Sequence, residues 1–119
     1  MKRLCLLILC CLATAYAWAG SPYVSRVFEF LPAPGQFVNT LPPYESGDDA
    51  ASMAQKVLER IGGRANGSAV SLGGYGGYLV VGFDHAIANE PDACDFKIYG
   101  NAYTGNAEPG VIAVMKDEN

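Results

Sequence analysis

The sequence predicts a mainly β protein with one helix, folded as a β-sandwich that is incomplete at its C-terminus. Short β-prone runs alternate with loops rich in Gly, Pro and Asn, which is typical of a sandwich. One run with helical periodicity, residues 50–61, stands among them. The last β-prone run ends at Met115, close to the final Asn119, so we expect a fragment of a longer domain.

The expected strands differ in how they would be buried. Tyr78–Phe83 is apolar nearly throughout, as in a strand covered on both faces. Asp95–Tyr99 alternates instead, which puts Phe96 and Ile98 on one face. The complete set comprises a first strand over Tyr23–Leu31, an extended piece over Gln36–Asn39, and strands over Ala69–Leu72, Tyr78–Phe83, Asp95–Tyr99 and Val111–Met115.

The helix is predicted by its stripe and by both of its ends. Ser46–Asp49 supplies capping oxygens and negative charge at the start. Gly62 and Gly63 end the helix as a C-cap. Apolar residues recur every three or four positions and predict a face that covers the core: Ala50, Met53, Ala54, Val57, Leu58 and Ile61.

Residues 1–19 have the pattern of a signal peptide. Basic residues precede an apolar stretch over 4–15, and small residues flank a possible cut after Ala17 or Ala19. The stretch is shorter than the about 20 residues that span a bilayer. We expect an exported protein, at the cell surface, in the outer membrane or extracellular, in preference to the periplasm. Membrane contact would come only through this segment, or through a lipid on one of the cysteines that end the leucine run.

Removal of residues 1–19 leaves a single domain, 20–119. The chain has 8 basic and 12 acidic side chains, and the loss of Lys2 and Arg3 leaves 6 against 12, a net charge of −6. Such a surface repels phosphate backbones, which excludes nucleic acid as a partner. Cys94 is then the one remaining cysteine, so we expect no internal disulfide and a small buried apolar residue.

A glycine-rich segment around Tyr75 is the clearest local motif. It lacks the Gly-Lys-Ser/Thr ending and the following helix of a phosphate-binding loop. We expect positive φ and close backbone approach at a sharp hairpin, with Tyr75 and Tyr78 presenting rings to a ligand. The glycines are Gly73, Gly74, Gly76 and Gly77.

The predicted ligand site combines these rings with acidic and amide bends that we expect to converge at one end of the sandwich. Aromatic rings with a few polar groups are typical of sites for sugars or flat cofactors. Solvated loop charges and plain turns are the alternative interpretation. The six residues are Tyr75, Tyr78, Asp84, Asn89, Asp95 and Asn101.

Metal and catalytic chemistry have weaker support. His85 is the single histidine, so a structural zinc site lacks ligands, and we expect a hydrogen-bonding loop residue. Asp117 and Asn119 begin a calcium-loop pattern, which makes calcium the candidate ion, and no pattern demands another cofactor. Four loop carboxylates suit calcium better than a glycosidase pair: Asp84, Asp92, Asp95 and Glu108. We therefore expect no enzyme.

Four segments together carry a resemblance: Ser71–Asp84, Ile87–Asn89, Asp95–Asn101 and Glu108–Val114. They resemble a family of secreted bacterial cell-surface proteins, often described as carrying polycystic-kidney-disease (PKD) repeats. The resemblance covers about residues 27–119 and implies a galactose-binding-like jelly roll. Family members continue past Asn119 through a Gly-Asp-Gly segment and a Trp-Tyr-Glu motif, which implies truncation here.

The resemblance implies a role at the cell surface. Some family members are encoded beside outer-membrane uptake systems, including those for corrinoids, which implies capture of a nutrient. We expect a noncatalytic, exported module that binds a glycan or a small nutrient such as a corrinoid. Two alternatives stay open: a structural or adhesion module that contacts neighbouring surface proteins, and a hydrolase fragment with an Asp/Glu pair.

Overall fold

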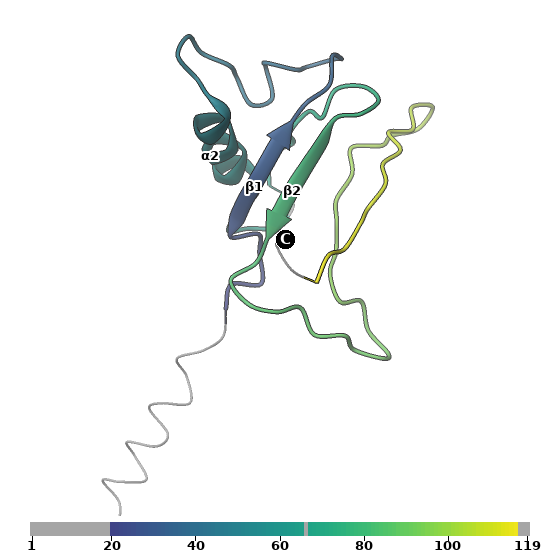
Figure 1. Ribbon diagram of the computed structural model, residues 1–119. Coiled ribbons are helices and arrows are strands. Elements are labelled where there is room, and N and C mark those ends of the chain that lie inside the picture. Colours follow the sequence, from purple (N-terminus) through teal and green to yellow (C-terminus); the bar gives the residue numbers. More distant parts are fainter. Residues whose placement is uncertain (1–19, 66, 117–119) are drawn as a thin grey trace, which may run out of the picture. The chain divides into compact units, whose positions relative to one another are not determined.

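The computed structural model describes residues 20–65 and 67–116 of the chain, and two compact units meet in sequence between Ala88 and Asn89. Within these described residues, the helix and both strands lie in the first unit (Figure 1). The predicted signal segment and the calcium-loop residues Asp117 and Asn119 lie outside the described residues.

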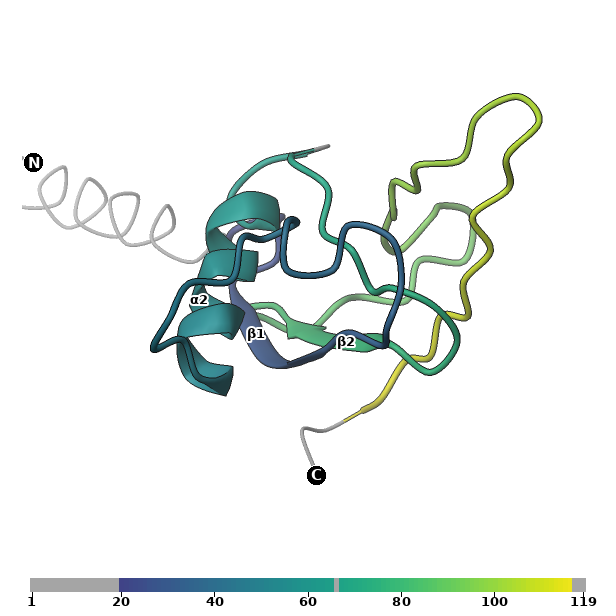
Figure 2. The same cartoon turned by 90° about the horizontal axis from the view of Figure 1, so that it is seen from above.

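The first unit is built on two antiparallel strands, β1 (Arg26–Leu31) and β2 (Tyr78–Gly82). The register places Leu31 opposite Tyr78, and a β-bulge interrupts it between Val27 and Glu29. Helix α2 packs against β1, so that β1 lies between the helix and β2 (Figure 2). The predicted strands at 23–31 and 78–83 are therefore confirmed over residues 26–31 and 78–82.

Helix α2 (Ala50–Ile61) confirms the helix prediction, including its ends. The Asp49 carboxylate accepts a hydrogen bond from Ser52 N at 2.8 Å, and Ser52 Oγ accepts one from Asp49 N at 2.9 Å. This reciprocal capping satisfies two donors that the helix itself leaves free. At the other end, Gly62 N donates to Leu58 O at 2.7 Å. Val57 on this helix and Pro42 are fully buried.

The proline-rich segment 32–49 folds over the residues that precede β2. Ala33 N donates to Leu72 O at 3.0 Å, and Ser71 N donates to Leu41 O at 2.7 Å. The predicted extended piece Gln36–Asn39 is wrong, because Phe37 and Asn39 adopt positive φ values of 62° and 64°. Both Thr40 N and Leu41 N donate to Phe37 O, which closes a turn in place of an extended run.

The predicted jelly-roll-like β-sandwich is wrong for the described residues, which hold one two-stranded sheet and one helix. Ala69–Leu72, Asp95–Tyr99 and Val111–Met115 are not strands. The physical reason is pairing: β-prone composition favours a pleated, half-buried surface but does not provide the partner strand that a ladder requires. Segment 69–72 bonds irregularly to the proline-rich loop instead, and Val111 is 99% exposed.

The second unit is held by local contacts. Tyr103 N donates to Asn106 O at 3.1 Å and Asn106 N donates back to Tyr103 O at 2.9 Å, around Gly105 with a φ of 83°. Cys94 is exposed, so the predicted burial of this thiol is wrong, because the residues around it form an exposed turn and not a strand. Across the described ranges, no helix combines the length and the apolar character of a membrane span.

Candidate functional site

The turn that carries Tyr75 is fixed by its glycines. Gly73 and Gly76 have φ values of 73° and 95°, which side chains disfavour. A Cβ on Gly73 would overlap the Ala33 carbonyl oxygen, so backbone approaches backbone there. The predicted positive φ and close approach are confirmed. The hairpin is not, because β2 pairs with the distant β1.

Tyr75 stands fully exposed on this turn, and Tyr78 follows three residues later as the first residue of β2. The Tyr78 hydroxyl donates to Glu29 Oε1 at 2.6 Å. This hydrogen bond raises the pKa of Tyr78 above its ordinary value, because the neutral phenol is the form that donates to the carboxylate. We call Tyr75, Tyr78 and Glu29 the tyrosine cluster, because the two tyrosines are three positions apart in sequence and Tyr78 is hydrogen-bonded to Glu29.

Glu29 is the member of the tyrosine cluster that the sequence did not reveal. It lies on β1, opposite Val80 of β2, and 49 residues before Tyr78. The register pairs Glu29 with Val80 and Leu31 with Tyr78, so Glu29 is the diagonal neighbour of Tyr78 across the two strands. The register between two distant strands leaves no signature in a single sequence, so no local signal pointed to Glu29.

Asp84 lies beyond the opposite end of β2. Its Oδ2 accepts a hydrogen bond from Ser21 N at 3.0 Å, and its Oδ1 lies 2.7 Å from His85 Nδ1. These contacts with His85 and Ser21 lower the pKa of Asp84 below its ordinary value. Because an ionised carboxylate only accepts, His85 Nδ1 carries the proton. The prediction that His85 is a hydrogen-bonding loop residue is confirmed.

The structure does not bring Asp84 to the tyrosines. Tyr78 is the first residue of β2, and Asp84 lies six positions further along the chain, which is roughly 20 Å of extended chain. Asn89, Asp95 and Asn101 belong to the second unit, where all three are exposed. Asp95 Oδ1 accepts a hydrogen bond from Glu90 N at 2.9 Å, which is a local loop contact.

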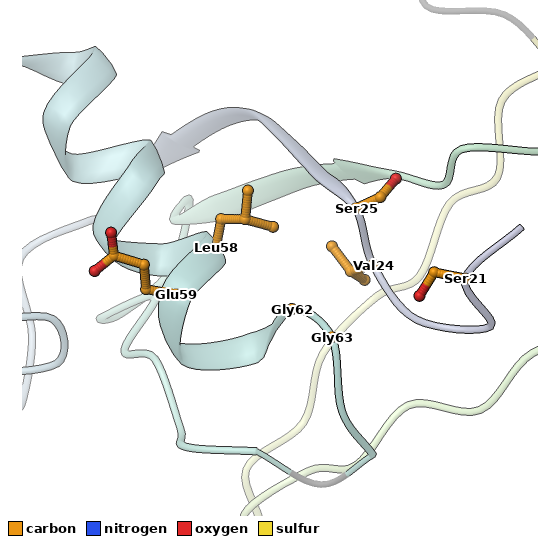
Figure 3. Close-up of a pocket in the computed structure, with 7 residues that line it drawn as sticks. All are labelled: Ser21, Val24, Ser25, Leu58, Glu59, Gly62 and Gly63. Carbon is orange, nitrogen blue, oxygen red and sulfur yellow. The ribbon is translucent and has the colours of Figure 1, made fainter.

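A hollow of 310 Å³ lies between the residues before β1 and the C-terminal end of α2. Figure 3 shows Val24 and Leu58 beside it, while the Glu59 carboxylate points away from Ser21. Ligand sites place a few polar groups convergently in an apolar cavity of about 300–1,000 Å³. This hollow is at the lower limit and has no convergent ionisable group, so it makes a poor ligand site.

Metal and acid–base chemistry find little support among the described residues. Across 20–65 and 67–116, no group of three or more His, Cys, Asp or Glu side chains is placed to hold a metal ion. None of the described hydrogen bonds joins two of the four loop carboxylates that the sequence singled out. The tyrosine cluster is therefore the best-formed candidate site.

Comparison of the chain with protein-family models, with curated proteins and with solved structures finds no match.

Proposed function

We propose that the chain is an exported, noncatalytic binding module of the cell surface that captures a neutral glycan on the tyrosine cluster. The observation that carries the proposal is the fully exposed ring of Tyr75 on a turn fixed by glycines and main-chain contacts. A tyrosine side chain has only two torsion angles, so its ring loses little conformational freedom when the apolar face of a sugar stacks on it.

The rest of the tyrosine cluster supplies the polar half of such a site. Glu29 Oε1 accepts from Tyr78, and a carboxylate has further lone pairs for sugar hydroxyls. The net charge of −6 on residues 20–119 repels anionic ligands and leaves neutral ones favoured. The signal pattern of residues 1–19 supports the export that the proposal requires.

A glycan array probed with the processed chain, followed by calorimetry on the best neutral sugar and on a corrinoid, tests the proposal. Tyr75→Ala should weaken sugar binding about tenfold, which corresponds to about 1.4 kcal/mol of stacking. Tyr103→Ala, which removes an exposed tyrosine of the second unit, is the matched control and should bind as the unaltered chain does. Equal sugar affinity of the Tyr75→Ala variant and the unaltered chain would contradict the proposal. Binding of the corrinoid but of no sugar would also contradict it.

A second function has its own observation. Val111–Met115 is an apolar run with four strongly exposed side chains in the second unit: Val111, Ile112, Val114 and Met115. Exposed apolar patches mark surfaces for other proteins. This favours the structural or adhesion module that contacts neighbouring surface proteins. Light scattering of the processed chain and of Ile112→Asp separates the two functions, since only adhesion predicts association that this change abolishes.

A further inference from the structure

The turn that carries Tyr75 lies against a second turn, which follows β1 in the proline-rich segment. Gly74 N donates to Pro34 O at 3.2 Å. The Ser71 hydroxyl, just before the first turn, donates to Gln36 O at 2.6 Å. Both turns lie at the same end of the sheet, one after the last residue of β1 and one before the first residue of β2 (Figure 1). The two main chains therefore hold each other at one end of the first unit.

Phe37 is the unusual residue of the second turn, because its φ of 62° is a conformation that bulky side chains rarely adopt. Its carbonyl oxygen accepts hydrogen bonds from Thr40 N at 3.1 Å and from Leu41 N at 3.0 Å, so the turn fixes this backbone. Asn39 has a similar φ of 64°, which asparagine tolerates. The Phe37 side chain is 55% exposed, so its burial offsets little of the strain. An exposed aromatic ring on a strained backbone points to a role in binding.

The contact between the turns limits how far apart Phe37 and Tyr75 can be. A Cβ on Gly35 would lie 2.5 Å from Gly74 N, so the two main chains touch at this point. Phe37 follows Gly35 by two positions, and Tyr75 comes directly after Gly74. Because consecutive Cα atoms are about 3.8 Å apart, the Cα atoms of Phe37 and Tyr75 are separated by at most about 17 Å. A chain of several sugars is long enough to reach both rings.

We propose that Phe37 and Tyr75 are two stacking positions for one neutral oligosaccharide. This inference rests on the proposed function, adds Phe37 to its site and makes a chain of several sugars its ligand. Once one sugar stacks on Tyr75, stacking of another sugar of the same chain on Phe37 is intramolecular, which raises the affinity. Phe37 has no hydrogen-bonding group in its side chain, so this position selects the apolar face of a sugar and not a pattern of hydroxyls.

The test is calorimetry of the processed chain with one neutral glycan from the array, in a series from the disaccharide to the hexasaccharide. The affinity should rise with chain length until the glycan reaches both rings, and then level off. Phe37→Ala should weaken binding of the hexasaccharide about tenfold and remove the dependence on length. Phe96→Ala, which removes an exposed phenylalanine of the second unit, is the matched control and should change neither.

Phe37→Asn separates the ring from the fold of the turn. It should melt about 4 °C above Phe37→Ala, because asparagine tolerates the positive φ better than alanine does. It should nevertheless weaken hexasaccharide binding as much as Phe37→Ala does, because both variants lack the ring. Full affinity of the Phe37→Asn variant would mean that the ring has no part in binding, and would overturn the proposal.

The outcomes distinguish this inference from the proposed function. If Tyr75→Ala weakens binding of every glycan in the series while both Phe37 variants bind as the unaltered chain does, the second stacking position is overturned and the proposed function stands. An affinity of the unaltered chain that does not depend on glycan length has the same meaning. If no glycan binds, or if Tyr75→Ala has no effect on any of them, the proposed function and this inference both fail.

Discussion

The two units of this chain have β-prone segments of similar composition, yet among the described residues strands occur only in the first unit. In the first unit, hydrogen bonds join residues far apart in sequence, such as Ala33 with Leu72 and Ser25 with Gly82. In the second unit, the described hydrogen bonds span at most the five residues between Glu90 and Asp95. The difference shows that long-range partners, more than composition, decide where these segments become strands.

The largest expected contrast comes from one substitution made in both units. Val57→Ala should lower the free energy of unfolding by about 2–3 kcal/mol, because Val57 is fully buried and the change leaves a cavity. Val111→Ala should change it by less than about 0.5 kcal/mol, because Val111 is almost fully exposed. Urea unfolding followed by helix circular dichroism measures both. A large loss at Val111 would show that the second unit packs in the folded protein.

Two glycines with positive φ give the next contrast. Gly73→Ala should cost about 2 kcal/mol or more, because the new Cβ meets the Ala33 carbonyl oxygen as well as an unfavourable φ. Gly105→Ala in the second unit should cost about 1 kcal/mol, because its φ is equally unfavourable but the space around it is open. Thermal unfolding of both variants measures the difference. Equal losses would show that the close approach at Gly73 is not rigid.

A smaller effect is expected from the aspartates that accept main-chain hydrogen bonds. Asp49→Ala should cost about 1 kcal/mol, because it removes the N-cap of α2. Asp95→Ala should cost less than about 0.5 kcal/mol, because its bond to Glu90 N lies in an exposed loop. The urea midpoints of the two variants measure this difference in stability. An equal loss of stability in both variants would contradict the contrast between the units.

The sequence was sufficient for elements whose signals are local. The stripe from Ala50 to Ile61, with Asp49 before it and Gly62 after it, predicted α2 to the residue. The apolar run at Tyr78–Phe83 predicted β2. This prediction is correct because the run pairs with β1 in the fold. Asp95–Tyr99 shows an equally clear strand pattern, in which apolar and polar residues alternate. No residue pattern indicates which distant segment would pair with it. The sandwich prediction failed at that step.

The residues of the candidate site also differ in whether a local signal predicted them. Glycines around Tyr75 predicted an unusual turn, since positive φ is a property of single residues. Glu29 was missed, because it reaches its partner Tyr78 across the fold. The register between β1 and β2 has to be known before such a partner can be assigned.

The smallest expected effect is a dependence of stability on pH that originates in the first unit. Asp48 Oδ2 accepts from Lys56 Nζ at 2.7 Å, and this bond lowers the pKa of Asp48 below its ordinary value of 3.8. A carboxyl whose folded pKa is lowered stabilises the fold above its unfolded pKa, and that contribution is lost as the pH falls through the folded value. Asp48→Asn should therefore flatten the acid side of the stability curve below about pH 4.

The ion pair between Asp48 and Lys56 also predicts a loss of stability at high pH. Hydrogen bonds to Asp48 and Glu45 raise the pKa of Lys56 above its ordinary value of 10.5. A lysine with a raised folded pKa stabilises the fold below its unfolded pKa, and the contribution is lost as the pH rises through the folded value. Lys56→Met should therefore reduce the loss of stability at high pH. In the Lys56→Met background, Asp48→Asn should also lose most of its effect on stability at low pH. Additive effects of the two changes across the pH range would mean that the ion pair between α2 and the preceding loop is not formed in solution.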